Sequence, residues 1–257
     1  MQATDCFYSQ MATHDYFSDH ASIYARYRID YPGELYDFIL TYVPTRQTAW
    51  DCATGNGQAA LALSNYFDEV EATDLSEEQL RNAPRRYNVN YQKAIAEAPP
   101  FLDETFDLIT VGQALHWFDV PKFHEQANRV LKPKGIIAEW GYGLNEVSPA
   151  VDALVRFLYR EVLGPYWDPL RRHIETEYRD LPFDFANVKE GRFVARREWL
   201  VEWYMNYLRT WSAVQAFRKR NGYDIIDQFD SDFRRVWGTT GTREVRFPIF
   251  LRLGMKK

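Results

Sequence analysis

The sequence predicts an α/β fold, in which a mostly parallel, doubly wound sheet carries helices on both of its faces. Short apolar runs alternate with segments of helical spacing between residues 48 and 140, and this alternation is typical of strands joined by crossover helices. Glycine and polar residues follow the apolar runs, where the carboxyl ends of parallel strands would form a ligand site.

The first elements can be identified in order along the chain. The run TAWDCAT (48–54) predicts a strand, and GQAALALSNYF after it has apolar residues at helical spacing. A second short strand ends at Asp74, and Ser76 is expected to cap the helix EEQLRNA. A weaker strand candidate covers residues 89–95, and FDLITVGQAL predicts a buried strand.

The pattern changes in the second half of the chain. Pro121 opens the helix PKFHEQANRVL, KPKG is expected to end it, and the apolar run 135–140 predicts another strand. After Pro149, helical segments follow one another up to a strand-like tail, REVRFPIFLRLG. Five of the eight tryptophans lie in this part of the chain, so we expect it to form a lobe that covers a substrate.

Composition narrows the classes of function. The formal net charge is −5, so there is no global basic field of the kind that nucleic-acid binding requires. The only cysteines, Cys6 and Cys52, suggest no disulfide framework, and no run reaches the ~20 apolar residues of a membrane-spanning helix. We expect a cytoplasmic protein with neither a nucleic-acid nor a membrane partner, and the oligomeric state stays open.

The most informative segment follows the first strand and reads DCATGNGQ from residue 51. Gly55 and Gly57 permit positive φ and let the backbone approach a ligand, although two glycines can also simply make a tight turn. Asp74 ends the next strand, where a carboxylate can accept both hydroxyls of a ribose. Ala60 replaces the third glycine of a dinucleotide turn, and Asp51 would repel a pyrophosphate but attract an amino group. A sulfonium nucleoside therefore fits this segment better than NAD.

DCATGNGQ resembles motif I of the class I S-adenosylmethionine-dependent methyltransferases, usually D-x-G-x-G-x-G, with Ala53 replacing the first glycine. TDLS resembles the second motif, AIAE the third, and FDLITVGQALHWFD with VLKPKG the fourth and fifth, so the resemblance covers about residues 20–140. QALHWF and YARYRIDYP are similar to the methyltransferase type 11 branch, which includes trans-aconitate methyltransferase-like proteins. The resemblance implies a Rossmann-like, seven-stranded sheet with S-adenosylmethionine as cofactor.

The resemblance also implies roles for individual residues. Ile95 stands where the family often has an acid, so another group would bind the adenine amino group. An N-terminal segment covers the cofactor in similar proteins, although a surface helix is the alternative for it here. The expected cofactor-binding residues are Asp51, Ala53, Gly55, Gly57, Asp74, Leu75, Ala96, Glu97, Gln113, Tyr24 and Arg28. The expected organisation is a covering segment (1–34), a cofactor-binding core (35–147), and a substrate lobe with the last strands (148–257).

Methyl transfer is an in-line displacement at a carbon that the sulfonium activates, so the protein mainly aligns the reactants and excludes water. There is no CxxC or HExxH motif, and the histidines lack metal-ligand spacing, so no metal is expected. His116 follows the fourth predicted strand beside Trp117, and it is the candidate to orient the acceptor or accept its proton. A packed His-Trp corner is the alternative, and His124 is expected to be solvated.

Arg192 and Arg196 lie in GRFVARREW, where strand alternation would put them on one face. Arginine forks bind carboxylates bidentately, so this pair could hold an acceptor carboxylate, with solvent-facing charges as the alternative. The sequence therefore predicts methyl transfer to a small-molecule acceptor. Because Arg192 and Arg196 could hold a carboxylate, the acceptor is a candidate carboxylate, and Trp117 is a further candidate contact for it. An RNA or protein methyltransferase and a non-catalytic S-adenosylmethionine-binding protein are the alternatives.

Overall fold

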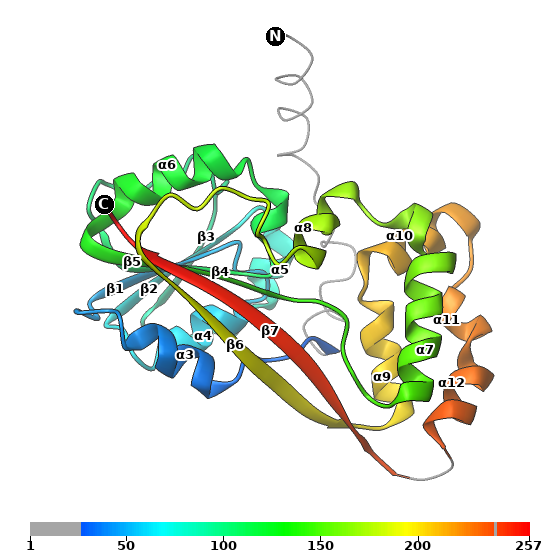
Figure 1. The fold of residues 1–257 in the computed structure, drawn as a ribbon. Helices are drawn as coiled ribbons and strands as arrows, with labels where there is room; N and C mark the ends of the chain where they lie inside the picture. The colour runs from blue at the N-terminus through cyan, green and yellow to red at the C-terminus, as the bar shows by residue number, and fades with distance from the viewer. Residues whose placement is uncertain (1–26, 239–240) are drawn as a thin grey trace.

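A computed structural model describes residues 27–238 and 241–257, and its centre is one seven-stranded mixed sheet (Figure 1). The strand order is β3-β2-β1-β4-β5-β7-β6. β1 to β5 run parallel, whereas β7 is antiparallel to both of its neighbours, β5 and β6. This arrangement confirms the predicted fold class. The strands are β1 (Thr48–Cys52), β2 (Glu69–Asp74), β3 (Val89–Lys93), β4 (Phe106–Gly112), β5 (Leu131–Tyr142), β6 (Ala186–Trp199) and β7 (Arg243–Met255).

Helices cover both faces of the sheet, with α6 on one face and α3 and α4 on the other (Figure 1). The α-helices are α3 (Gly33–Leu40), α4 (Gln58–Leu63), α5 (Glu77–Asn82), α6 (Val120–Val130), α7 (Pro149–Phe157), α8 (Arg172–Glu175), α9 (Val201–Arg209), α10 (Ser212–Asn221), α11 (Ile225–Gln228) and α12 (Asp230–Trp237). Single turns of 3-10 helix follow β4 at η2 (Leu115–Trp117) and lie in the lobe at η4 (Gly164–Tyr166) and η5 (Pro169–Arg171).

Strand alternation divides the sheet into two apolar cores. Ala49 and Leu108 belong to the core under α3 and α4, whereas their chain neighbours Trp50 and Ile109 belong to the core under α6. Successive side chains of a strand point to opposite faces, so central strands covered on both sides are apolar throughout. Full burial of a leucine or isoleucine side chain, such as Leu108 or Ile109, stabilises the fold by roughly 1.5–3 kcal/mol.

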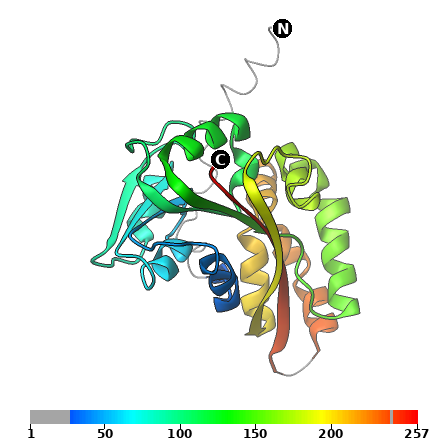
Figure 2. The same ribbon diagram turned by 60° about the vertical axis from the view of Figure 1, so that its left-hand side comes forward.

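The helical lobe is inserted into the last connections of the sheet. α7 and α8 lie between β5 and β6 in the chain, and α9 to α12 lie between β6 and β7. Figure 2 shows the long β6 and β7 running side by side from the sheet to these helices. Trp199 and Trp211 are buried in the core that the lobe shares with the sheet, whereas Trp203 is 37% exposed.

One predicted boundary is wrong. KPKG does not separate a helix from a strand, because β5 already begins at Leu131, which pairs with Phe106. The next pair is Ile136 with Leu108, so residues 132–135 form a bulge within β5. The helix expected after Pro149 is present as α7, and the π-helical turn η3 (Leu158–Val162) continues it.

Candidate functional site

The turn between β1 and α4 has an unusual backbone. Ala53, Gly55 and Gly57 all have positive φ, of 54°, 57° and 82°. Positive φ strains the backbone of a residue with a side chain by about 1–2 kcal/mol. Glycine avoids this strain, and Ala53 does not. A Cβ on Gly55 would meet no atom within 4 Å. The backbone of Gly55 therefore faces open space at the carboxyl end of β1.

Asp51 lies beneath this turn with its carboxylate buried. Its Oδ2 accepts hydrogen bonds from the Thr54 hydroxyl at 2.5 Å and the Ala60 backbone N–H at 3.0 Å, and its Oδ1 accepts from the Thr110 hydroxyl at 2.8 Å. Burial raises the pKa of Asp51 to about 6, an effect that these hydrogen bonds oppose and the charge of Asp74 reinforces. Asp51 thus holds the turn in shape and carries a charge that titrates close to neutrality.

Asp74 joins the ends of β2 and β1. Its Oδ2 accepts from the Gly55 N–H at 2.8 Å, and its Oδ1 accepts from the Ser76 N–H at 2.9 Å. Ser76 also caps α5, as predicted, because its hydroxyl accepts from the Gln79 N–H. Asp74 thus links the turn after β1 to the residue that caps α5.

Two apolar side chains lie exposed next to Asp74. Leu75 follows β2 and Ile95 follows β3, and each is 37% exposed although both are large and apolar. Since β2 and β3 are parallel neighbours, their carboxyl ends meet at one edge of the sheet. Ala96 is buried beside them. Paired apolar side chains at the end of a sheet suit the faces of a flat, apolar ring.

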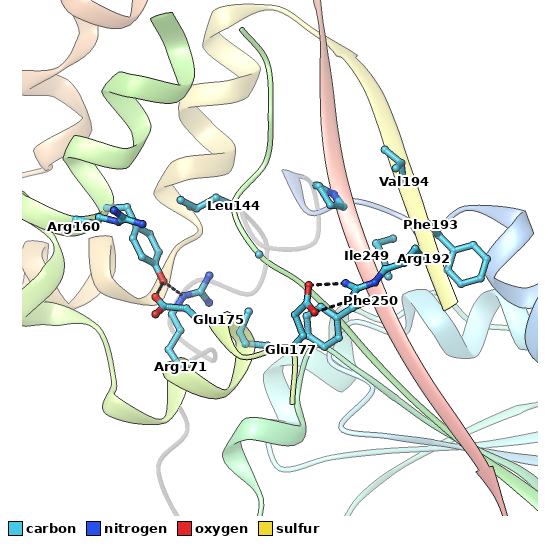
Figure 3. Close-up of a pocket in the computed structure, with 14 residues that line it drawn as sticks. Leu144, Arg160, Arg171, Glu175, Glu177, Arg192, Phe193, Val194, Ile249 and Phe250 are labelled. Carbon is cyan, nitrogen blue, oxygen red and sulfur yellow. Dashed lines mark hydrogen bonds and ion pairs between the residues drawn. The ribbon is translucent and has the colours of Figure 1, made fainter. Parts of the chain in front are cut away.

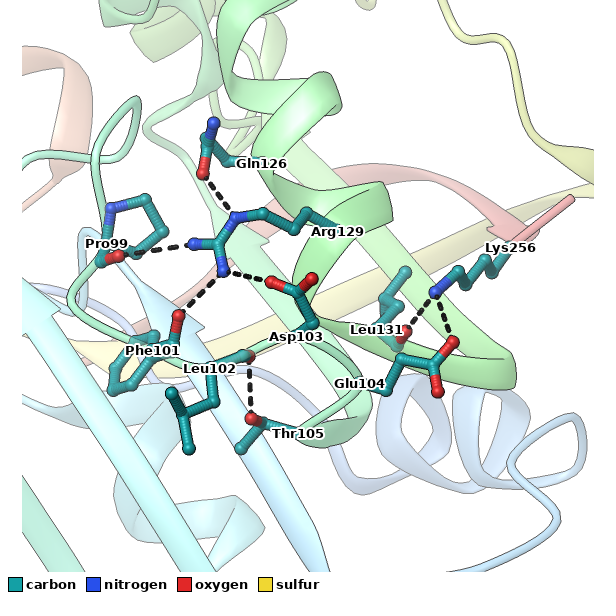
Figure 4. A network of polar contacts seen from close by, with 10 residues as sticks. All are labelled: Pro99, Phe101, Leu102, Asp103, Glu104, Thr105, Gln126, Arg129, Leu131 and Lys256. Carbon is teal, nitrogen blue, oxygen red and sulfur yellow. Dashed lines mark hydrogen bonds and ion pairs between the residues drawn. The ribbon is translucent and has the colours of Figure 1, made fainter.

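Glu97 and Arg129 fasten the loop that carries Ile95 to the rest of the fold. Glu97 Oε1 accepts the Asp119 N–H at 2.7 Å, and burial raises the pKa of Glu97. Arg129, from α6, donates to the carbonyls of Pro99 and Phe101 and to Asp103, as Figure 4 shows. The guanidinium of Arg129 thus holds the loop between β3 and β4 in place.

A small cavity, here called the turn cavity, opens at the carboxyl ends of β1, β4 and β5. Gln113 has φ of 60° and is fixed by two hydrogen bonds to the backbone of Tyr142, one accepted at 2.7 Å and one donated at 3.0 Å. Arg28 donates to the Tyr142 hydroxyl at 2.7 Å. Tyr24 lies outside the described residues. The cavity is lined by Tyr31, Asp51, Gly55, Gly112, Gln113 and Tyr142, among others.

A second, larger cavity of about 680 Å³ lies next to the turn cavity, between the lobe and β6 and β7 (Figure 3). We call it the lobe chamber; Leu144, Tyr159, Arg171, Arg192, Ile249 and Phe250 are among the residues that line it. Gly141 separates the two cavities, because a Cβ there would lie 2.9 Å from Gln113 on one side and 2.7 Å from Phe250 on the other. A small molecule in the chamber would therefore lie close to one bound at the turn.

The two predicted arginines have different positions. Arg192 lines the lobe chamber and forms a bidentate ion pair with Glu177, with nitrogen–oxygen distances of 2.5 and 2.6 Å. Arg196 pairs with Glu244 at 3.2 Å on the exposed surface and does not line the chamber. The structure thus brings one of the pair to the chamber, and the charge of that one is neutralised by a carboxylate.

His116 and Trp117 form a packed corner after β4. Their ring centroids are 4.5 Å apart, and the Tyr178 hydroxyl lies 3.5 Å from Nδ1 of His116. Burial, with the nearby positive charge of Arg171, lowers the pKa of His116 well below its usual value of 6.5. His116 is therefore neutral at pH 7 and is a weak base.

The expectation for His124 is wrong. Its ring is buried, and its Nε2 lies 2.6 Å from Oε1 of Glu139, which has no exposed surface. Arg252 donates to the other oxygen of Glu139 at 2.7 Å and to the carbonyls of Tyr178 and Leu181. This buried network connects α6, β5 and β7 to the loop that bounds the lobe chamber.

Comparisons with known proteins agree with this geometry. The methyltransferase type 11 family model, described as a methyltransferase domain, matches residues 50–138. A provisionally named methyltransferase of Dictyostelium discoideum is 31% identical over 251 residues, covering 95% of each chain. The solved structure of a provisionally named type II methyltransferase from Anaeromyxobacter dehalogenans superposes with a TM-score of 0.81, at 38% identity over 89% of this chain and 97% of that one.

A Saccharomyces cerevisiae protein, provisionally named an S-adenosylmethionine-dependent methyltransferase, is 23% identical over 83% of this chain and 86% of its own length. The chain belongs to the class I S-adenosylmethionine-dependent methyltransferases. It uses S-adenosylmethionine as its methyl donor.

The residues at the strand ends fit that cofactor. A Cβ on Gly55 would meet none of the described protein atoms within 4 Å, and the Asp74 carboxylate accepts the Gly55 N–H beside this space. Leu75 and Ile95 offer apolar surface to a base. The methyltransferase sequence motifs therefore converge on one edge of the sheet, with the turn cavity at its centre.

Sequence reasoning missed several residues of this methyltransferase site. Tyr31 and Tyr142 line the turn cavity, and Tyr159 and Arg171 line the lobe chamber. Tyr31 lies within YARYRIDYP, so the motif itself contained a signal for it. Arg171 follows β4 by more than fifty residues and reaches the chamber only because the lobe folds back over the sheet, so no local pattern could identify it.

Within residues 27–238 and 241–257, no group of three or more His, Cys, Asp or Glu side chains could hold a metal ion. In the same ranges, none of the helices combines the length and the apolar character that crossing a bilayer would need. Cys52 is a buried free cysteine.

Proposed function

We propose that this methyltransferase transfers the methyl group of S-adenosylmethionine to a small-molecule acceptor that carries a carboxylate. The observation that supports this proposal is the lobe chamber, which adjoins the turn cavity across Gly141. Its volume of about 680 Å³ lies within the 300–1,000 Å³ typical of small-molecule sites. Its charged lining includes Arg171 and Arg192, and arginine is well suited to binding carboxylates.

The cofactor assignment follows from the acceptors and surfaces at the strand ends. We assign the ribose hydroxyls to Asp74, and the adenine to the surface between Leu75 and Ile95, next to Ala96 and Glu97. The methionine end would lie in the turn cavity near Asp51 and Gln113, with Arg28 and Tyr24 in the segment that covers it. Ala53, Gly55 and Gly57 would provide the backbone surface between these two ends.

The bound cofactor supplies a methyl group that its sulfonium already activates toward nucleophiles. The chain then has to align the acceptor with that methyl group and exclude water, which can lower the barrier by several kcal/mol. The side chains of Gln113 and Phe250 fill the space that a Cβ on Gly141 would occupy, so they bound the region between the two cavities. His116 and Trp117 lie in η2 after β4 and are not among the residues that line either cavity, and we expect them to orient the acceptor by packing from there.

The size of the chamber favours a small acceptor over a macromolecule. RNA methylation needs a basic face that tracks phosphates, whereas the residues that line the chamber include both arginines and glutamates, and Arg192 is paired with Glu177. A trans-aconitate-like branch would agree with a carboxylated acceptor. In this scheme residues 148–257 form the acceptor lobe, 35–147 the cofactor core, and 1–34 the cover.

The test measures cofactor binding and methyl transfer separately. S-adenosylhomocysteine should raise the melting temperature of the protein and NAD should not, because only a ligand of the folded state stabilises it. Asp74→Ala should weaken S-adenosylhomocysteine binding at least a hundredfold, since charge-assisted hydrogen bonds to the ribose are lost. Labelled-methyl transfer is then screened over carboxylic acids, phenols and amines.

The control is Asp68→Ala, which removes an exposed carboxylate just before the start of β2, at the amino end of the strand that ends in Asp74. Tight binding of S-adenosylhomocysteine to Asp74→Ala would contradict the position of the ribose. Normal cofactor binding without transfer to any acceptor in the screen would favour a non-catalytic binding protein.

A further inference from the structure

The charges that line the lobe chamber do not cancel. Three arginines, Arg160, Arg171 and Arg192, face two glutamates, Glu175 and Glu177, which leaves one excess positive charge. Glu177 is engaged by Arg192 through two short bonds and also by Arg179, which is not among the residues that line the chamber. The excess charge therefore lies on the lobe side of the chamber, as Figure 3 shows.

Arg171 is held in place without a carboxylate of its own. Its Nε donates to the Tyr159 hydroxyl at 3.0 Å, and that hydroxyl donates to Glu175 at 2.8 Å. Its guanidinium lies 4.4 Å from the ring centroid of Trp167, a cation–π contact that fixes its plane. Among the described residues, no carboxylate oxygen lies within 4.0 Å of Arg171. Both terminal nitrogens of an oriented fork thus keep their N–H donors for a ligand.

The rest of the chamber is apolar. Leu144, Ile174, Val194, Ile249 and Phe250 provide its walls, together with Phe193. A cation at one end of an apolar cavity selects an amphipathic ligand with an anionic head group. The excess positive charge of the lining favours an anionic ligand over a neutral ligand of the same shape.

The position of Arg171 relates this head group to the reaction. η5, which ends at Arg171, contacts η2 after β4, and the charge of Arg171 acts on the imidazole of His116. The fork is thus close to the strand end beside which the turn cavity opens. An anion held there would place the rest of the molecule along the apolar wall of β6 and β7.

We propose that Arg171, oriented by Tyr159 and Trp167, binds the carboxylate of an amphipathic acceptor and thereby selects the substrate class of this methyltransferase. This inference rests on the proposed function, and it assigns the carboxylate to a residue other than Arg192 and Arg196. Arg192 keeps its charge satisfied by Glu177 and serves as a wall of the chamber.

The test uses two isosteric probes, 1-naphthoate and 1-naphthamide, titrated calorimetrically into the protein saturated with S-adenosylhomocysteine. The probes share an apolar skeleton and differ in charge. We expect the wild type to bind 1-naphthoate at least tenfold more tightly than 1-naphthamide. Arg171→Gln should remove that preference and leave the affinity for 1-naphthamide within twofold. The matched control is Arg218→Gln, which removes one exposed positive charge of the same lobe outside the chamber and should leave both affinities unchanged.

Each other outcome overturns the inference. Equal affinities in the wild type, or no binding of either probe, would show that the chamber does not select anions. A preference that survives in Arg171→Gln would assign the carboxylate to another group. If Arg171→Gln fails to fold, Arg171→Lys replaces it, because lysine keeps the positive charge but lacks the two parallel donors of the guanidinium. A preference for 1-naphthoate equal to that of the wild type would then contradict binding of the carboxylate by the Arg171 guanidinium. Loss of S-adenosylhomocysteine binding by the wild type would instead contradict the proposed function.

Discussion

Tyr91 occupies the space into which a side chain on Gly57 would point. A Cβ on Gly57 would lie 2.5 Å from the Tyr91 hydroxyl oxygen and 3.1 Å from two of its ring carbons. Tyr91 comes from β3, so the shape of the turn after β1 depends on a residue two strands away. The second glycine of the motif is therefore required by packing as well as by its positive φ.

Gly57→Ala should destabilise the protein more than Gly55→Ala. Both substitutions force alanine into positive φ, at about 1–2 kcal/mol, and Gly57→Ala adds an overlap with Tyr91 worth roughly 1–3 kcal/mol. Urea unfolding without cofactor measures the difference. The variant Tyr91→Ala in the Gly57→Ala background should recover the overlap but not the backbone strain, in a double-mutant cycle. Equal losses for the two glycine variants would contradict this account.

Cofactor binding should depend on pH through Asp51. Its pKa of about 6 means that its carboxylate is charged at pH 7.5 and protonated at pH 5. If the carboxylate attracts the ammonium group of the cofactor, the Kd of S-adenosylhomocysteine should rise by up to tenfold for each pH unit below 6. Adenosine lacks that ammonium group and should show no such dependence. Asp51→Asn should weaken binding at pH 7.5 and flatten the profile; an unchanged profile would place the ammonium group elsewhere.

The same group has the opposite effect on the stability of the protein without cofactor. The folded state holds the proton of Asp51 more tightly than the unfolded state does, so protonation of Asp51 stabilises the folded state. This stabilisation is complete below pH 4 and is lost as the pH rises through 6. A pKa raised from 3.8 to about 6 corresponds to roughly 3 kcal/mol. Urea unfolding of the wild type and of Asp51→Asn between pH 4 and pH 7.5 measures this effect. The difference between their free energies of unfolding should grow toward high pH.

Local features of the site could be predicted from sequence because their causes are local. The turn at Gly55 and Gly57 and the cap at Ser76 depend on residues within a few positions of one another. The position of Asp74 follows from strand order, since β1 and β2 are parallel neighbours and end together. The comparisons with known methyltransferases agree with the fold that these features predicted.

Long-range contacts could not be predicted in the same way. Arg171 and Tyr91 reach the site through the lobe and through a distant strand, respectively. His124 is a different case. It lies four residues after Val120 and three before Ala127, both on the buried face of α6, so helical spacing already indicated its burial. The polarity of His124 favours exposure, but its position on the helix favours burial, and Glu139 is the partner that makes burial possible.

The buried network should make Arg252 a large contributor to stability. Arg252→Met leaves the carboxylate of Glu139 without one of its two partners and releases the carbonyls of Tyr178 and Leu181. Removal of one member of a buried ion pair costs about 3–5 kcal/mol. Glu139→Gln in the Arg252→Met background should restore part of that loss, because no unpaired charge stays buried. Urea unfolding of both single variants and the double variant measures the coupling, and additive losses would mean that the two side chains act independently.

His116→Gln should separate proton transfer from packing. The pKa of His116 is depressed in the folded state, so its contribution to stability is present above pH 6.5 and is lost as pH falls and the unfolded chain takes up the proton. The variant should therefore lose less stability than the wild type between pH 7.5 and 5. A base with so low a pKa drives proton abstraction poorly, so we expect kcat to stay within about threefold and its pH profile to keep its shape. A hundredfold loss of kcat with unchanged S-adenosylhomocysteine and 1-naphthoate affinities would instead show that His116 accepts a proton from the acceptor despite its burial.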